Sequence, residues 1–327
     1  MGLSISGRGQ EGPEAVDGQP AHGHLLWGRG ESLDVARDSR TYISNKRATR
    51  GLGLVPRVRG ALRDGLATFF PSLLKQLLVL RARPQGGDRE LALLHALVEP
   101  HREAIDVGAH RGLYSLYLER IVGPDRLHLF EPVPELHRYL RRLFPRAHVH
   151  SVALSDAPGE STLSVPVIQG RQFVSRATLQ PDLEEVGATG RSQLPVVTRR
   201  LDDYLEDGTL HDVGFLKIDV EGHELQVLRG AQRLLRTSRP VLLVEIECRH
   251  HRFPVSRVHE WLHDVGYDLY FLNPAGTNLV AIREFSAERD QDPSAMGAGR
   301  YVNNFFCLPR GRVPRLLAQV RERLRHA

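Results

Sequence analysis

Short apolar runs alternate with helix-like segments between about residues 100 and 310. The runs that predict β-strands lie at 104–107, 126–130, 148–153, 214–219, 241–246, 268–272 and 303–307. The segments with apolar residues at helical spacing lie at 113–122, 134–143, 222–236 and 255–265. Strands that alternate with helices in this way form parallel sheets with right-handed crossovers. We therefore predict an α/β fold built on a doubly wound, mostly parallel seven-stranded sheet.

The pattern changes on both sides of this central region. Residues 1–58 are rich in Gly, Pro, Arg and Ser and lack apolar periodicity, so we predict a disordered N-terminal extension. Residues 59–100 carry leucines at helical spacing and predict short helices, which are divided at Pro71. Residues 311–327 predict an amphipathic basic helix that docks on the main domain at 101–310.

A long insertion separates the third and fourth predicted core strands. Segments 161–167 and 195–198 have the composition of added strands, and they flank a loop at 168–194 that is rich in Gly, Arg, Gln and Ser. Loops of this length inside a compact domain are usually functional or disordered. Together with the N-terminal helices, this loop can exclude water from a site at the edge of the sheet.

The most informative motif follows the first predicted strand and reads Asp106-Val107-Gly108-Ala109-His110-Arg111-Gly112. Gly108 and Gly112 permit a tight turn with its backbone close to a ligand, because neither residue has a Cβ. Asp106, at the end of the strand, can accept hydrogen bonds from a cationic amine. The spacing does not fit G-x-G-x-x-G, the dinucleotide fingerprint. It favours a ligand without a pyrophosphate that binds at a helix N-terminus, such as S-adenosylmethionine.

A second acidic residue, Glu131, closes the next predicted strand about 25 positions after Asp106. Nucleotide-binding folds place a ribose-binding carboxylate close to this offset. We therefore predict that Glu131 accepts hydrogen bonds from both ribose hydroxyls, although a solvated acid at a strand end remains the alternative.

A third acidic group, Asp219, Glu221 and His223, follows the predicted strand at 214–219. On an extended segment Asp219 and Glu221 share a face, and two carboxylates on one face repel unless they hold a cation, a proton or a ligand. We predict that this group supplies the general base, while Asp219 can instead position the cofactor or the substrate. We predict no metal, although Asp219, Glu245 and a histidine form a conceivable ligand set.

His250 and His251 follow the fifth predicted strand. Neighbouring side chains on extended backbone point to opposite sides, so we do not expect these two histidines to form a joint site.

The chain resembles the FkbM-type methyltransferases, a branch of the seven-stranded S-adenosylmethionine-dependent fold. The matching blocks, in order, are Ile105–Ala109 with Gly112 and Tyr114–Leu116, Phe130–Pro134, Ala153–Asp156 with Gly159, Arg200–Tyr204 and Leu216–Leu225. The family commonly has Asn where this chain has His110.

The resemblance implies a class I methyltransferase-like Rossmann fold with S-adenosyl-L-methionine as cofactor. It further implies methylation of a hydroxyl oxygen on a small-molecule or glycan acceptor, such as a sugar or another natural product. Beyond Asp106, Gly108, Gly112 and Glu131, the cofactor-binding residues that it indicates are Ala109, Tyr114, Ser115, Pro132, Ser155 and Asp156.

Composition narrows the possible partners. The net charge is +5, but 44 basic residues are well mixed with 39 acidic ones, so we expect no nucleic-acid partner. The two cysteines, Cys248 and Cys307, predict neither a metal site nor a disulfide framework. The sequence has no run of 18 apolar residues and no secretory h-region, so we expect a cytoplasmic protein without stable membrane insertion. The oligomeric state stays open.

Two other classes of protein remain open on the residues alone. One is a nucleotide-binding protein without catalysis, and the other is an NAD-type oxidoreductase on a Rossmann-like fold. The oxidoreductase would share the first two strands, but it needs a glycine that this chain lacks.

Overall fold

The computed structural model describes residues 63, 65–81, 89–180, 183, 185, 187–251, 253–294 and 300–326. The predicted extension at 1–58 lies outside the described residues. In the predicted helical segment, α3 (Pro71–Arg81) begins at the proline that was expected to divide it. This position suits proline, since the first helical residue needs no backbone N–H partner.

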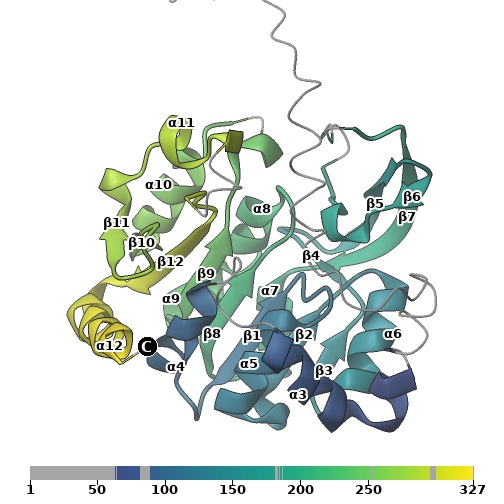
Figure 1. The fold of residues 1–327 in the computed structure, drawn as a ribbon, viewed down its shortest axis with the longest axis horizontal. Coiled ribbons are helices and arrows are strands. Elements are labelled where there is room, and N and C mark those ends of the chain that lie inside the picture. Colours follow the sequence, from purple (N-terminus) through teal and green to yellow (C-terminus); the bar gives the residue numbers. More distant parts are fainter. Residues whose placement is uncertain are drawn as a thin grey trace, which may run out of the picture. The chain divides into compact units, whose positions relative to one another are not determined.

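The main sheet is mixed. Among the described residues it has eight strands in the order β11-β10-β12-β9-β8-β1-β2-β3 (Figure 1). Five neighbouring strands are parallel: β9 (Val241–Glu245), β8 (Val213–Ile218), β1 (Glu103–Val107), β2 (Leu127–Phe130) and β3 (His148–His150).

The prediction of a mostly parallel seven-stranded sheet is therefore only partly right. β12 (Asn304–Pro309) runs antiparallel between β9 and β10 (Tyr267–Leu272), and β11 (Leu279–Ala281) pairs antiparallel with β10. Parallel neighbours need a crossover of a dozen or more residues, usually a helix. Between β10 and β12 the longest helix among the described residues is the four-residue α11 (Ala287–Asp290), so these last strands return antiparallel.

The insertion forms a second, four-stranded sheet in the order β4-β7-β5-β6. The added strands predicted inside it are present as β5 (Gly159–Ile168) and β7 (Gly190–Arg199), and the loop between them contains β6 (Arg171–Gln172). The single strand predicted at 148–153 is wrong. Its first half is β3 in the main sheet, while β4 (Ala153–Leu154) pairs with β7 in the second sheet.

Helices cover both faces of the main sheet, because alternate strand residues point to opposite faces. On one face Ala104 packs in a cluster with leucines of α4 (Leu94–Leu97), α5 (Leu113–Val122) and α12 (Val313–Arg325). On the other face, Ile105 and Val107 pack with a second helical layer. That layer contains α7 (Leu201–Glu206), α8 (Glu224–Arg229), α9 (Gln232–Thr237) and α10 (Ser256–Asp264).

The remaining elements are short connections, apart from α6 (Pro134–Leu143), which follows β2. The 3₁₀ turns are η2 (Arg89–Leu93), η3 (Pro124–Arg126), η4 (Val174–Arg176), η5 (Cys248–His250), η6 (Ile282–Glu284) and η8 (Arg310–Arg312). None of the helices in the described ranges combines the length and apolar character that crossing a membrane requires.

The helix predicted at 222–236 is broken into α8 and α9 around Gly230 and Ala231. A Cβ on Gly230 would lie 2.0 Å from the carbonyl oxygen of Ser155, so the backbones of α8 and the β4 region approach as closely as they can. Asp202 caps the second helix, because its carboxylate accepts hydrogen bonds from the backbone N–H groups of Arg233 and Leu234. The break is therefore a packing feature that helical periodicity could not indicate.

Candidate active site

A cavity of about 370 Å³ lies where β1, β2, β8 and β9 end. The carboxyl ends of parallel strands are where open α/β sheets bind ligands. The predicted site residues that line the cavity are Asp106, Gly108, Ala109, Tyr114, Glu131, Pro132, Asp219, Glu221 and His223. The predicted residues Gly112, Ser115, Ser155 and Asp156 are not among the lining residues.

The turn after β1 depends on its glycines. Gly108 has φ +74°, and a Cβ there would lie 1.9 Å from the carbonyl oxygen of Asp219. The N–H groups of Gly108 and Ala109 both donate to the carbonyl of Phe130, which fixes the turn to β2. Gly112 has a structural role, since a Cβ there would lie 2.6 Å from the Phe144 ring.

His110 lies in the same turn with φ +49°. Asn, Asp and His are enriched in this left-handed region among residues other than glycine. The conformation therefore agrees with the Asn that the resembling family commonly has at this position.

Asp106 is buried at the end of β1, 3% exposed. Burial raises its pKa to about 6, while Ser115 and Lys217 oppose the increase. The Ser115 hydroxyl donates to Asp106 Oδ2 at 2.5 Å, which orients the carboxyl group. Ser115 thus contacts a cavity residue without lining the cavity itself.

Glu131 holds two loops together. Its Oε2 accepts from the backbone N–H of His110 at 2.8 Å, and its Oε1 accepts from that of Val133 at 2.9 Å. Burial raises its pKa to about 7, although both hydrogen bonds lower it. Each carboxylate oxygen has a second lone pair, so Glu131 can still accept from a ligand in the cavity.

Lys217 is a site residue that the motif analysis did not single out. It is 1% exposed on β8, and its ammonium lies 3.8 Å from a carboxylate oxygen of Asp219 and 3.8 Å from one of Glu245. The ammonium also lies 5.0 Å from the centre of the Tyr114 ring. The available signal was a lysine within an apolar strand, since a lysine is rarely buried without a charged partner.

Asp219 and Glu221 reach the cavity by a geometry different from the predicted one. β8 ends at Ile218, and Glu221 has φ +52°, so the two residues are not on one extended segment. The insertion holds this loop from outside: the Thr178 hydroxyl donates to the carbonyl of Glu221 at 2.7 Å. The Gln180 amide donates to the carbonyl of Gly222 at 3.0 Å.

His223 lies beside the first residues of α8. Its Nε2 is 2.9 Å from the Ser155 hydroxyl, and its buried Nδ1 has no hydrogen-bond partner among the described residues. Burial lowers its pKa, so the imidazole is neutral at pH 7. Ser155 also donates to the Asp156 carboxylate at 3.2 Å. Ser155 and Asp156 therefore support His223 instead of lining the cavity.

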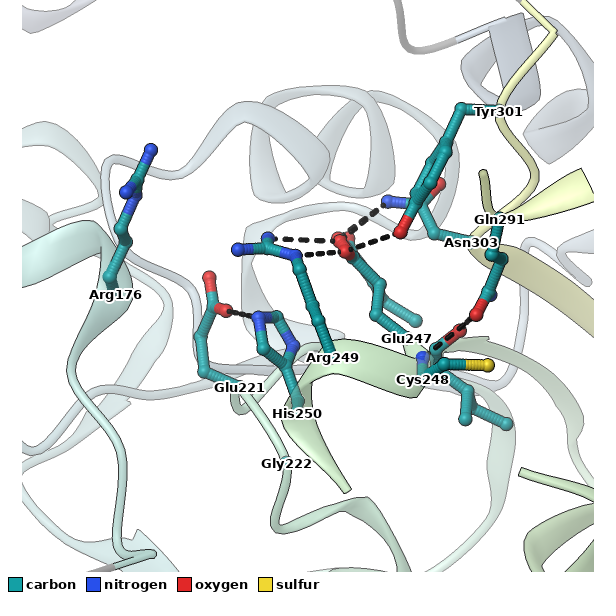
Figure 2. A network of polar contacts seen from close by, with 12 residues as sticks. Arg176, Glu221, Gly222, Glu247, Cys248, Arg249, His250, Gln291, Tyr301 and Asn303 are labelled. Atoms are coloured by element: carbon teal, nitrogen blue, oxygen red, sulfur yellow. Dashed lines mark hydrogen bonds and ion pairs between the residues drawn. The ribbon is translucent and has the colours of Figure 1, made fainter. Parts of the chain in front are cut away.

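A polar network centred on Glu247 lies beside the cavity (Figure 2). It was not predicted from the sequence. Glu247 accepts hydrogen bonds from Arg249, from the Tyr301 hydroxyl at 2.9 Å and from the Asn303 amide at 3.3 Å. Burial alone would raise the pKa of Glu247, but Arg249 and Tyr301 bring it down to about 2. The network joins η5 to the segment before β12, which are more than 50 residues apart in sequence.

His250 was considered in the sequence only together with His251, and no contact was predicted for it. It lies in η5, and its Nε2 is 3.0 Å from Oε2 of Glu221. His251 lies 3.1 Å from Glu224, so the two histidines do contact different groups. The residues next to His250 in the sequence could not indicate its contact with Glu221, because the contact joins the segments that follow two different strands.

The insertion contributes further lining residues, which share a small or apolar character apart from one hydroxyl: Leu163, Val174, Ser175, Ala177 and Leu179. Within the part of the chain that the structure describes, no three His, Cys, Asp or Glu side chains are grouped as a metal site. Cys248 and Cys307 are free thiols.

Comparisons with known proteins place this geometry in a family. The family described as "Methyltransferase FkbM domain" matches residues 106–269, which include the Gly108 turn, Glu131 and the Asp219–His223 loop. The match begins near the end of β1 and ends within β10, so it covers the parallel strands β2, β3, β8 and β9 together with the insertion.

Individual relatives are similar over shorter stretches. The AMB antimetabolite synthetase AmbE of Pseudomonas aeruginosa is 31% identical, with 41% of this chain and 8% of that protein covered. Methyltransferase sdnD of Sordaria araneosa is 30% identical, with 38% of this chain and 59% of that protein covered. The chain thus spans less than two thirds of the length of either relative.

Among solved structures, methyltransferase FkbM from Methylobacillus flagellatus KT is 15% identical, with a TM-score of 0.39. The alignment covers 76% of this chain and 59% of that chain. The family match extends over half of the present sequence, and the chain therefore belongs to the FkbM methyltransferase family.

Proposed function

We propose that this protein is an S-adenosylmethionine-dependent O-methyltransferase that acts on a hydroxyl group of a sugar or another natural product. One cavity joins the Gly108 turn and Glu131 to the acidic loop of Asp219 and Glu221, and this arrangement supports the proposal. The similarity to part of an antimetabolite synthetase supports a natural product as the acceptor. We assign the methyltransferase domain to residues 101–310.

The cavity suits the proposed cofactor in size and charge. Small-molecule sites have volumes of roughly 300–1,000 Å³, and this cavity has about 370 Å³. Glu131 would bind the ribose hydroxyls with its remaining lone pairs, and Asp106 would accept from the amino group. Both carboxyl groups are neutral in part near pH 7, because burial raises their pKa values. A cationic ligand favours their ionised forms and would compensate for the burial.

When it is bound, S-adenosylmethionine supplies an electrophilic methyl group. The residues of the chain then have three tasks. The Gly108 turn and Glu131 hold the reacting carbon in line with the acceptor oxygen, and such positioning is worth several kcal/mol. A base among Asp219, Glu221 and His223 takes the hydroxyl proton as the oxygen–carbon bond forms. The apolar residues of the insertion exclude water from the cavity.

Titration calorimetry with S-adenosylhomocysteine and with NAD tests the cofactor assignment. We expect S-adenosylhomocysteine to bind and NAD not to bind, because the turn lacks the dinucleotide spacing. Tighter binding of NAD would contradict the proposal and favour an oxidoreductase. Binding of S-adenosylhomocysteine without transfer of a labelled methyl group to any acceptor would favour a nucleotide-binding protein.

The variant Glu131→Ala tests the predicted ribose contact. Loss of two hydrogen bonds to a charged acceptor costs about 1.5–3 kcal/mol, so the Kd for S-adenosylhomocysteine should rise roughly 10- to 150-fold. Glu135→Ala is a matched control, since that side chain is 76% exposed on α6. An unchanged Kd in folded Glu131→Ala would limit this residue to holding its two loops.

A further inference from the structure

Glu221 is the point at which three separate segments of the chain meet. Thr178 and Gln180 of the insertion bind the backbone carbonyls of Glu221 and Gly222. The segment after β9 contributes His250, whose Nε2 lies 3.0 Å from Glu221 Oε2 (Figure 2). Glu221 also has a left-handed backbone, with φ +52°, which is uncommon for a residue other than glycine. Such a conformation persists only where the surroundings impose it.

The backbone of this loop packs directly on His250. A Cβ on Gly222 would lie 2.6 Å from the His250 carbonyl oxygen, so the space between the two backbones is too small for a side chain at position 222. The His250 side chain is buried, with the residue 6% exposed. This close packing fixes the imidazole beside the Glu221 carboxyl group.

The imidazole has one unused polar atom. Nε2 of His250 is buried and has no hydrogen-bond partner among the described residues. The Glu221 carboxylate at 3.0 Å is within reach. Catalytic hydrogen bonds are often poorly aligned without ligands and tighten when the site is filled.

We propose that His250 is a positioning residue for Glu221: its Nε2–H donates to the Glu221 carboxylate and keeps that group ionised and directed at the acceptor hydroxyl. This inference rests on the proposed O-methyltransferase function and selects one base from the three candidates. As the acceptor oxygen bonds to the methyl carbon, the carbon–sulfur bond breaks and sulfur keeps the electron pair. The hydroxyl proton passes to Glu221.

The electrostatics of the pair explain why a donor is needed. Burial, together with the charge of Asp219, raises the pKa of Glu221 well above its ordinary value. Burial lowers the pKa of His250 to about 4, so the imidazole is neutral at pH 7 and carries one N–H. The other charged or titratable groups that act on the pair are Glu224, Glu247, Arg249 and His251. Arg249 favours ionised Glu221, whereas Glu224 and Glu247 oppose its ionisation.

The test measures the ionisation of Glu221 in the full-length protein without an acceptor. Carboxyl infrared or ¹³C NMR titration, with Glu221→Gln to assign the signal, gives the pH midpoint. His250→Leu should raise the midpoint by at least one pH unit, a tenfold change in proton affinity. His250→Gln, whose amide nitrogen can replace Nε2–H, should restore it to within half a unit.

The control is His259→Leu, because His259 is also buried, also has an unpartnered Nε2 and also has a pKa lowered to about 4. Its loss should leave the Glu221 midpoint unchanged. If His250→Leu does not fold, the ¹⁵N shifts of His250 in the unmodified protein decide: a proton on Nε2 at pH 7 supports the proposal, and one on Nδ1 overturns it.

A midpoint that is the same in His250→Leu and in the unmodified protein overturns the inference, as does a failure of His250→Gln to restore it. Binding of S-adenosylhomocysteine is measured in parallel on the same samples. It should change less than twofold in His250→Leu, since His250 does not line the cavity. If the unmodified protein does not bind S-adenosylhomocysteine, the proposed function itself fails, which is a separate result.

Discussion

The two sides of the cavity are built from contacts of different range. On the turn side, which comprises Asp106, Gly108 and Glu131, the hydrogen bonds to the two carboxyl groups come from nearby residues: Ser115 is nine positions from Asp106, and His110 is 21 positions from Glu131. On the loop side, which comprises Glu221 and His250, the supporting residue Thr178 lies 43 positions from Glu221. The hydrogen bonds of the turn side therefore form once β1 and β2 pair, and only the packing of Gly108 on Asp219 adds β8. The loop side requires the insertion and the segment after β9.

The same difference appears in the electrostatics of the acids. Burial raises the pKa of Glu131 to about 7, although the two backbone N–H groups that donate to it oppose the increase. Glu221 has no such backbone donors at its carboxyl group in the described structure, and its pKa is raised well above its ordinary value. Glu247 lies nearby, but Arg249 and Tyr301 lower its pKa to about 2. Burial raises the pKa of both Glu131 and Glu221. Backbone donors from nearby residues oppose the increase at Glu131, and Arg249 from a distant segment opposes it at Glu221.

The largest effect on the turn side is expected for Gly108→Ala. The new Cβ would lie 1.9 Å from the carbonyl of Asp219, and the residue would keep φ +74°. Because steric strain and a left-handed backbone each cost about 1–3 kcal/mol, affinity for S-adenosylhomocysteine should fall roughly 30-fold or more in calorimetry. Gly170→Ala is the control, with φ +71° and nothing within 4 Å of its Cβ. Equal affinities of the two variants would remove the steric argument.

An intermediate effect is expected from pH. A carboxyl group with a raised folded pKa binds its proton more tightly in the folded state, so the ligand-free protein loses stability as pH rises from about 4.5 to about 7. Cofactor binding needs ionised Glu131, whose pKa is about 7. Affinity for S-adenosylhomocysteine should therefore rise about tenfold from pH 6 to pH 8.

Calorimetry in two buffers with different ionisation enthalpies should detect proton release on binding at pH 6.5. Glu131→Gln should reduce both the release and the pH dependence, since it removes one titrating group. An affinity that is flat between pH 6 and pH 8 would mean that Glu131 binds the ligand without a change in charge.

The smallest effect on cofactor binding is expected for Thr178→Val, which removes the donor to the Glu221 carbonyl. The lost hydrogen bond should cost about 1–2 kcal/mol of stability and lower Tm by a few degrees. Affinity for S-adenosylhomocysteine should change less than twofold. Thr189→Val serves as a control, because it removes an exposed hydrogen bond to the Val167 carbonyl. A tenfold loss of affinity in Thr178→Val would show that the two sides are coupled.

Several features could be predicted from the sequence because they depend on neighbouring residues. Apolar periodicity located the parallel strands, since each buries a short continuous run. The Gly108 turn and the acids directly follow the apolar runs that predict β1, β2 and β8. Because the carboxyl ends of parallel strands lie at the same edge of a sheet, these residues could be expected to lie close together. The nine predicted residues around the cavity follow from that rule.

The tertiary structure decided the rest. The last strands return antiparallel because the described residues between β10 and β12 contain no long crossover helix. The segment predicted as one strand at 148–153 divides between two sheets. Lys217 became a site residue through its burial between Asp219 and Glu245. His250 reaches Glu221 only because β8 and β9 are neighbours in the sheet and Gly222 allows their loops to touch. The pattern of residues along the chain cannot predict these side-chain contacts, because they depend on which strand ends the packed core brings together.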